Sequence, residues 1–219
     1  MRDIVVGEAP RGAIRVLDLG CGTGALTRRI AEALPAATVL GIDVSPANIA
    51  EARRLPSSAG QRVQFEVTNY LDLSQPPFDL VASDGVLHLI PGDTATLVRK
   101  LARDVRPGGV LVCAIPYACG YNAVFAIVRR LLRAIRAPWT DRLILRIGRA
   151  VHAREMDDAG LRERIDYMYL PPERVMDARL ERLFESAGFR RRAQYAAKHT
   201  SLSQLRHRIT VFERVPLDR

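Results

Sequence analysis

The segment Val16-Leu17-Asp18-Leu19-Gly20-Cys21-Gly22-Thr23-Gly24 carries the strongest structural signal in the chain. An apolar run that begins at Ile14 leads directly into three glycines, and an Ala/Leu/Ile-rich segment, 25–34, follows them. Glycines between a strand and a helix let the backbone turn tightly and approach a ligand, while the start of the helix presents unpaired N–H groups. The segment therefore predicts a strand, a ligand-binding loop and a helix in succession.

Short apolar runs alternate with segments of helical periodicity beyond this unit. Ser45 and Pro46 supply an N-cap and a proline at the first helical position, and residues 106–109 (Arg-Pro-Gly-Gly) predict a turn. Such alternation is typical of βαβ units and a mostly parallel sheet. Strands are expected at 14–19, 38–42, 63–67, 79–83 and 110–115, and helices at 25–34, 46–54 and 93–105.

The pattern changes after Pro116. Residues 117–170 show helical patterns and no clear strand, before a helix at 177–187 and two strands, 189–197 and 208–215, that are expected to pair antiparallel. About fifty residues far exceed the usual connection between neighbouring elements. We therefore expect a single domain over residues 1–219 with a helical insertion at 117–170. Because little chain precedes the first strand, that insertion is expected to supply the substrate lid.

Asp43 ends the second expected strand, 23 residues after Gly20. A carboxylate at that place can accept hydrogen bonds from both ribose hydroxyls of a nucleoside-type ligand. Gly20, Gly22 and Ala25 also satisfy the dinucleotide pattern G-x-G-x-x-G/A, so an NAD(P)-dependent oxidoreductase is one alternative. Asp18 argues against it, because a carboxylate inside the loop pocket suits a ligand ammonium better than a pyrophosphate.

With these motifs the chain resembles the class I S-adenosylmethionine-dependent methyltransferases. The resemblance covers roughly residues 14–116 and rests on four motifs in the family's order: Val16–Gly24, Gly41–Ser45, Phe78–Val81 with Val86-Leu87-His88, and Arg106–Gly109. It implies an α/β, doubly wound, Rossmann-like sheet of seven strands in the order 3-2-1-4-5-7-6, with the last-numbered strand antiparallel. It also implies S-adenosylmethionine as the cofactor and in-line transfer of its methyl group to an acceptor.

The same resemblance implies a cofactor site built from Asp18, Gly20, Cys21, Gly22, Gly24, Asp43, Val44, Asn69, Tyr70 and Ser83. The three glycines would contact the methionine and ribose portion, with Cys21 as a small filler among them. Asp18 would lie near the amino group, Asp43 would bind the ribose, and Val44 would pack on the adenine. Asn69, where the family usually has aspartate, and Tyr70 align with the segment that reads the adenine edge. Ser83 and Asp84 would face the transferable methyl.

His88 is the one histidine near the expected methyl-transfer face. A role as general base is an alternative to a structural role, and the structural role is favoured. His152, His199 and His207 show no metal-ligand spacing, so no metal is expected. The sequence 167–172 (Tyr-Met-Tyr-Leu-Pro-Pro) is interpreted equally well as pocket wall or as packing.

The composition is that of an ordinary globular protein, with 48% hydrophobic and 26% charged residues. Cys21, Cys113 and Cys119 form neither a metal spacing nor an even disulfide framework, so reduced thiols in a cytoplasmic protein are expected. The longest apolar run, 110–119, is too short to span a bilayer, and the N-terminus shows no secretory signal.

The net charge of +9 lies entirely in the second half of the chain. Residues 1–110 carry 12 basic and 12 acidic side chains, whereas Arg129–Arg154 contains eight arginines and the single acid Asp141. An apolar stripe with helical spacing accompanies these arginines: Val124, Ile127, Val128, Leu131 and Ile135. Phe125 and Leu132 are expected to widen this stripe. We therefore expect a basic amphipathic lid with peripheral contact to an anionic membrane through residues 121–154. The alternative is that the stripe packs on the sheet domain.

A small-molecule or lipid-like acceptor is expected. Enzymes that methylate amino groups of nucleic-acid bases carry an Asn/Asp-Pro-Pro-aromatic segment after the fourth strand, where this chain has Ser83-Asp84-Gly85-Val86. An RNA methyltransferase that uses the arginine-rich insertion is the second hypothesis, because a basic patch binds phosphates. The arginines lack interleaved exposed aromatics, so nucleic acid is the less favoured partner.

Overall fold

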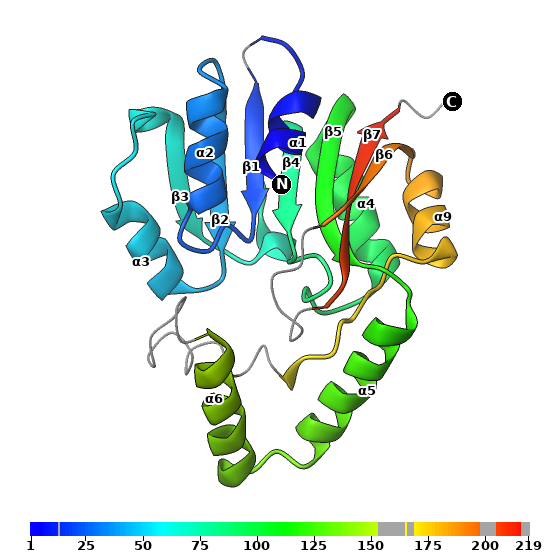
Figure 1. Ribbon diagram of the computed structural model, residues 1–219. Helices are drawn as coiled ribbons and strands as arrows, with labels where there is room; N and C mark the ends of the chain where they lie inside the picture. The colour runs from blue at the N-terminus through cyan, green and yellow to red at the C-terminus, as the bar shows by residue number, and fades with distance from the viewer. Residues whose placement is uncertain (13, 153–164, 166–168, 198–204, 216–219) are drawn as a thin grey trace.

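Seven strands form one sheet in the order β3-β2-β1-β4-β5-β7-β6 in the computed structural model (Figure 1). The structure describes residues 1–12, 14–152, 165, 169–197 and 205–215. Neighbours among the first five strands are parallel, whereas β7 runs antiparallel to both β5 and β6. The predicted fold class and strand order are therefore confirmed. The strands are β1 (Arg15–Leu19), β2 (Thr38–Asp43), β3 (Val63–Val67), β4 (Phe78–Asp84), β5 (Val105–Pro116), β6 (Phe189–Ala196) and β7 (His207–Arg214).

Both faces of the sheet are covered by helices, because successive strand residues point to opposite faces and both sets are apolar. Val16 and Leu80 pack in one core with α1 (Arg2–Glu8) and α2 (Ala25–Ala33). Leu17 and Val81 pack in a second core with α4 (Thr94–Asp104) and α9 (Ala178–Ser186). The central strands are almost continuously apolar in sequence because they are buried on both faces of the sheet.

Side-chain caps set the starts of three helices. Ser45 accepts a hydrogen bond from Asn48 N (3.2 Å) at the start of α3 (Pro46–Arg54). Asp93 does the same for Thr96 N (2.7 Å) in α4, and Asp177 for Leu180 N (2.8 Å) in α9. These caps satisfy N–H groups that the first helical turn leaves unpaired. Single turns of 3-10 helix occur at Gly60–Arg62 and Tyr70–Asp72.

Two parts of the sheet domain differ from the expectation. The residues before β1 form helix α1, whose Val5 is fully buried, so this stretch is part of the core. The turn expected at 106–109 lies inside β5 as a bulge, since Val105 pairs with Phe78 and Val110 with Leu80. Asp79, alone opposite the bulge, holds it through an ion pair with Arg106 (2.5 Å).

Helices α5 (Gly120–Ala134) and α6 (Pro138–His152) follow β5 and lie below the edge where the parallel strands end (Figure 1). Asn122 joins α5 to the sheet: its buried amide donates to Tyr117 O and Arg206 O at 2.8 Å each, and Arg206 N donates back to its Oδ1 at 2.7 Å. None of the helices in the described part of the chain is long and apolar enough to cross a membrane.

Candidate functional site

A cavity of about 580 Å³ opens at the carboxyl ends of β1 and β2. Its wall is formed by the loop after β1, the segment after β2, the residues that follow β3, and the loop after β4. Five of the ten predicted cofactor residues line it: Gly20, Asp43, Val44, Asn69 and Tyr70. Crevices outside the carboxyl ends of parallel strands are where open α/β sheets bind ligands.

The glycine loop is tied to β2 through its backbone. Gly20 N and Cys21 N both donate to Ile42 O at 2.9 Å, and Gly22 N donates to Asp43 Oδ2 at 2.9 Å. The loop therefore takes its shape from the neighbouring strand before any ligand arrives. Such preorganisation lowers the entropic cost of binding.

Steric crowding explains why glycine stands at two of the loop positions. Gly20 has φ +76°, and a Cβ built there would lie 2.2 Å from a methyl carbon of Val86. Gly24 has φ +77°, and its Cβ would lie 2.5 Å from the Phe65 ring. At Gly22 nothing lies within 4 Å of the corresponding Cβ. The middle of the loop therefore leaves room for a ligand, while its ends are packed.

The carboxylate of Asp43 organises the floor of the cavity. Its Oδ2 accepts from Gly22 N, while its Oδ1 accepts from Ser45 N (2.9 Å) and from the Asn48 amide (3.3 Å). Oδ2 therefore keeps one lone pair that a ligand hydroxyl can use, whereas both lone pairs of Oδ1 are taken. Asp43 thus has a structural role in addition to the ribose-binding role predicted for it.

Asp18 lies just beneath the loop and is almost completely buried. Burial, together with the nearby charges of Asp84 and Asp43, raises its pKa to about 7, although Thr27 donates a 2.6 Å hydrogen bond to its Oδ2. A carboxylate in such surroundings is stabilised by an approaching cation. This electrostatic setting suits the ligand amino group predicted for this position.

The remaining predicted residues divide between the surface of the cavity and the core. Val44 is exposed, with 58% of its surface accessible, and it offers an apolar wall. Asn69 Oδ1 already accepts from Leu71 N (3.1 Å), and the side chain of Tyr70 is buried with Lys100 over its ring. Cys21 packs beside Gly41, and Ser83 is fully buried, so neither side chain lines the cavity.

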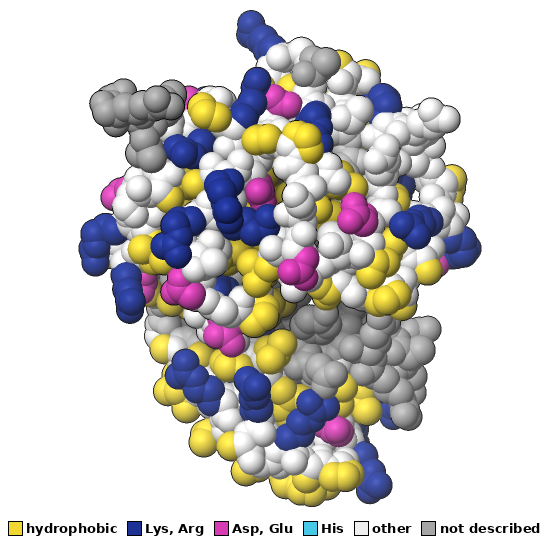
Figure 2. All heavy atoms as spheres, turned by 180° about the vertical axis from the view of Figure 1, so that it is seen from behind, with side chains coloured by type: hydrophobic (Ala, Val, Ile, Leu, Met, Phe, Trp, Pro, Cys, Tyr) yellow, Lys and Arg dark blue, Asp and Glu magenta, His cyan; other side chains and the backbone are white. Residues whose placement is uncertain are grey.

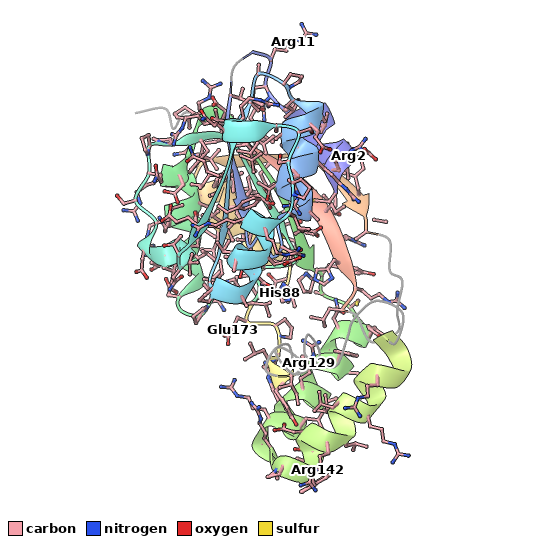
Figure 3. The ribbon with its side chains drawn as sticks, turned by 90° about the vertical axis from the view of Figure 1, so that its left-hand side faces the viewer. Arg2, Arg11, His88, Arg129, Arg142 and Glu173 are labelled. Carbon is pink, nitrogen blue, oxygen red and sulfur yellow. The ribbon has the colours of Figure 1, made fainter. Side chains whose placement is uncertain are left out.

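His88 lies beyond the cavity, at the sheet edge that faces α5 (Figure 3). It is buried, and its Nδ1 has no hydrogen-bond partner among the described residues. Burial lowers its pKa to about 3, and the positive charges of His207, Arg129 and Arg174 add to the effect. His88 is therefore neutral at physiological pH and a weak base.

His207 was missed by sequence reasoning, because it lies far from the loop motifs along the chain. Its ring centroid is 5.2 Å from that of His88 in an edge-on arrangement. His207 Nδ1 donates to Leu205 O at 2.8 Å, since a carbonyl oxygen can only accept. The antiparallel strand β7 starts at this residue, beside the end of β5, and so brings it to the same edge.

Arg174 is a second residue that sequence reasoning missed. Its buried guanidinium donates to the carbonyls of Leu87, Ile90 and Gly92, with distances of 3.1 Å to Leu87 O and 2.7 Å to Gly92 O. It thereby fixes the loop after β4 that forms one wall of the cavity. The only sequence signal is its place after the two prolines at 171–172, which gives no hint of the partner loop.

The side of α5 that faces the sheet carries two polar side chains, Asn122 and Arg129, beside the ring of Phe125. Asn122 is buried as described above, and Arg129 donates to Leu170 O at 2.9 Å while its guanidinium lies over the Phe125 ring. Figure 3 shows Arg129 below His88.

Tyr169 is buried and donates to Asp141 at 2.6 Å, so its role is packing against α6. Tyr167 and Met168 lie outside the described residues.

Comparisons with known proteins agree with this geometry. A family model for a methyltransferase domain matches residues 16–109. The trans-aconitate 2-methyltransferase of Streptomyces avermitilis is 35% identical over 152 residues, which cover 67% of this chain and 55% of that protein. The enzyme of the same name from Methylobacterium nodulans is 42% identical over 104 residues, 47% of this chain and 38% of that protein.

The chain belongs to the class I S-adenosylmethionine-dependent methyltransferase family. Its cofactor is accordingly S-adenosylmethionine. The chain spans about half the length of the curated relatives that it matches. One similar solved structure is that of Burkholderia thailandensis 1,6-didemethyltoxoflavin-N1-methyltransferase with 1,6-didemethyltoxoflavin and S-adenosylhomocysteine bound. The TM-score is 0.64 at 16% sequence identity, and the match covers 98% of this chain and 76% of that chain. At that identity the likeness concerns the fold alone.

The residues of this methyltransferase chain fit its cofactor. Gly22 leaves open space in the loop, Asp43 Oδ2 has a lone pair beside the cavity, and Asp18 is a buried carboxylate that a cation would stabilise. Val44 adds an exposed apolar side chain where a flat ring can pack.

Proposed function

We propose that this chain transfers the methyl group of S-adenosylmethionine to a small-molecule acceptor. The observation that carries the proposal is the cavity of about 580 Å³ between the preorganised glycine loop and Asp43. In this proposal Asp43 holds the ribose, Val44 packs on the adenine, and Asp18 faces the amino group. The cofactor supplies an activated methyl group, so the chain has mainly to bind, align and exclude water.

We propose further that the acceptor carries a carboxylate. His88 is neutral and weakly basic, and Arg129 and Arg174 add positive charge on that side. A carboxylate is already ionised at neutral pH, so it needs no general base to become a nucleophile, whereas an alcohol does. The trans-aconitate 2-methyltransferase names of the relatives support the same class of acceptor.

A lipid-like acceptor has less support. It would require an apolar lining on the acceptor side, but the face of α5 toward the sheet carries Asn122 and Arg129. Within the proposal, α5 and α6 form the acceptor-side wall and the substrate lid. The positive charge of Arg129 on this wall favours an anion.

The cofactor part is tested by calorimetric titration with S-adenosylhomocysteine. We expect a Kd in the micromolar range, about −8 kcal/mol, and no comparable binding of NAD. Asp43→Ala is expected to weaken binding by about 1.5–3 kcal/mol, the range for hydrogen bonds to a charged partner. It also removes the acceptor of Gly22 N and Ser45 N, so the unliganded protein is expected to lose about 1–2 kcal/mol of stability.

Wild-type affinity in Asp43→Ala would show that Asp43 is not the ribose ligand. The acceptor part is tested by methyl transfer to di- and tricarboxylates against matched alcohols and amines. Turnover of the alcohols alone would contradict the carboxylate proposal and leave the cofactor proposal standing.

A further inference from the structure

The apolar stripe of α5 points outward, away from the sheet. Of the ten large hydrophobic side chains that are exposed in the described part of the chain, seven belong to α5, α6 and the turn between them. Val124, Leu131 and Trp139 have 62%, 61% and 58% of their surface accessible. These seven residues form what we call the outer surface: Val124, Ile127, Val128, Leu131, Ile135, Trp139 and Leu143.

The opposite, inner side of the two helices contacts the rest of the chain. On that side, Asn122 of α5 and Thr140 and Ile144 of α6 are buried, and Arg129 donates a hydrogen bond to Leu170 O. Phe125, expected to widen the apolar stripe, instead lies on this inner side, stacked on Tyr121 and beneath Arg129. The helices therefore pack on the protein through their inner side, and the outer surface stays exposed.

Positive charge surrounds the outer surface. Arg130, Arg133, Arg142 and Arg146 are exposed on the two helices. Asp141 is the one acidic residue between 120 and 152, and it is engaged by Tyr169 (2.6 Å) and Arg136 (3.3 Å). Figure 2 shows the lower part of the molecule, built from α5 and α6, covered by hydrophobic and basic side chains with few acidic ones. Arg142 lies at its far end (Figure 3).

We propose that the outer surface binds peripherally to an anionic lipid membrane. An apolar helix face flanked by arginines is suited to the boundary between headgroups and acyl chains, where the apolar side chains enter and the guanidinium groups meet lipid phosphates. A second copy of this chain is a poorer partner, because the exposed arginines beside the outer surface, Arg130, Arg133, Arg142 and Arg146, would face the same four of the other copy. A nucleic acid would pair with the arginines and leave the apolar stripe in water.

This proposal does not rest on the proposed function. The outer surface lies on the side of α5 away from the cavity, so cofactor binding and membrane binding are separable. Unchanged S-adenosylhomocysteine affinity in the variants below distinguishes a failure of the membrane proposal from a failure of the enzyme.

The sole tryptophan of the chain, Trp139, provides the readout. The full chain is mixed with phosphatidylcholine vesicles, or with vesicles of equal parts phosphatidylcholine and phosphatidylserine, at low and high salt. Trp139 emission is expected to shift to shorter wavelength with the anionic vesicles at low salt, and the protein to sediment with them. The neutral vesicles are expected to produce neither effect.

Two variants and one control separate the contributions. The triple substitution Arg133→Gln, Arg142→Gln, Arg146→Gln is expected to weaken binding to the anionic vesicles roughly a hundredfold, since each basic side chain near the surface contributes about a factor of five. The pair Val124→Gln, Leu131→Gln is expected to abolish the Trp139 shift. Arg11→Gln, Arg29→Gln, Arg103→Gln removes the same net charge from exposed sites on the sheet domain and is expected to retain binding.

Equal loss in the control triple would overturn the proposal, because binding would then follow net charge alone. Absence of binding to anionic vesicles at low salt would also overturn it. The proposal would also be overturned if the wild type formed a dimer and did not bind vesicles, and if Leu131→Gln converted that dimer into a monomer. Binding to an RNA oligonucleotide, but not to vesicles, through the same three arginines would assign the surface to nucleic acid instead.

Discussion

Two environments of opposite charge lie along the carboxyl edge of the sheet. Around the glycine loop, burial raises the pKa of Asp18, and the nearby negative charges of Asp84 and Asp43 raise it further. Around His88, burial lowers the pKa of the imidazole, and the nearby His207 and the positive charges of Arg129 and Arg174 lower it further. A cation-bearing ligand is favoured on one side and an anion on the other.

This difference supports the division of labour that we propose. S-adenosylmethionine carries an ammonium and a sulfonium, which suit the acidic side, and a carboxylate acceptor suits the basic side. Before the transfer the sulfonium is positive and the carboxylate negative, so each environment would favour the binding of its own reactant.

The largest effect is expected from the pH dependence contributed by Asp18. Its pKa is about 7 in the folded chain against an ordinary value of 3.8, so between these pH values the folded state binds a proton that the unfolded state has lost. Stability therefore falls as the pH rises from about 4 to 7. A difference of roughly three between the two pKa values corresponds to about 4 kcal/mol.

Urea denaturation of wild type and Asp18→Asn across this pH range measures that contribution. The two proteins are expected to be similarly stable near pH 4, and the variant to be the more stable one at pH 8, because asparagine mimics the protonated acid. Parallel stability curves would mean that Asp18 is ionised throughout. Saturating S-adenosylhomocysteine is expected to reduce the wild-type slope, since its ammonium stabilises the carboxylate.

Gly20→Ala and Gly22→Ala form a matched pair within the loop. Both positions have positive φ, which costs an alanine about 1 kcal/mol. Only at Gly20 would the new methyl group collide with Val86, at 2.2 Å, which adds about 2 kcal/mol of overpacking. We expect losses of about 3 and about 1 kcal/mol in the free energy of unfolding. Equal losses would show that Val86 moves aside without cost.

The acidic side and the loop were largely predictable from sequence. Gly20 and Asp43 both line the cavity because they lie directly at the ends of neighbouring strands, and the carboxyl ends of parallel strands share one edge. The helix start at Pro46 was predictable for a similar reason, since a cap and its helix are adjacent in sequence. The strand order came from the family resemblance and not from local pattern.

The basic side was less predictable, because its contacts join residues that are distant in the chain. Arg174 fixes a loop more than eighty residues earlier, and Asn122 pairs with Arg206 at a similar separation. Helical spacing correctly placed the apolar residues of α5 on one face. It could not show that the inner contacts would go to Asn122 and Arg129, which left the apolar face outside.

The smallest effect is expected on the outer surface, where Leu131→Gln should change the free energy of unfolding by less than about 0.5 kcal/mol. The side chain is 61% accessible, and glutamine forms helix about as well as leucine, so neither burial nor propensity is lost. The matched substitution Ile144→Gln, in α6, places an amide where the isoleucine is buried and should cost about 3 kcal/mol. Urea denaturation of the two variants, without lipid and at several protein concentrations, makes the comparison. A large loss in Leu131→Gln that grows with protein concentration would mean that a second copy covers the outer surface, whereas a small, concentration-independent change leaves that surface free for a membrane.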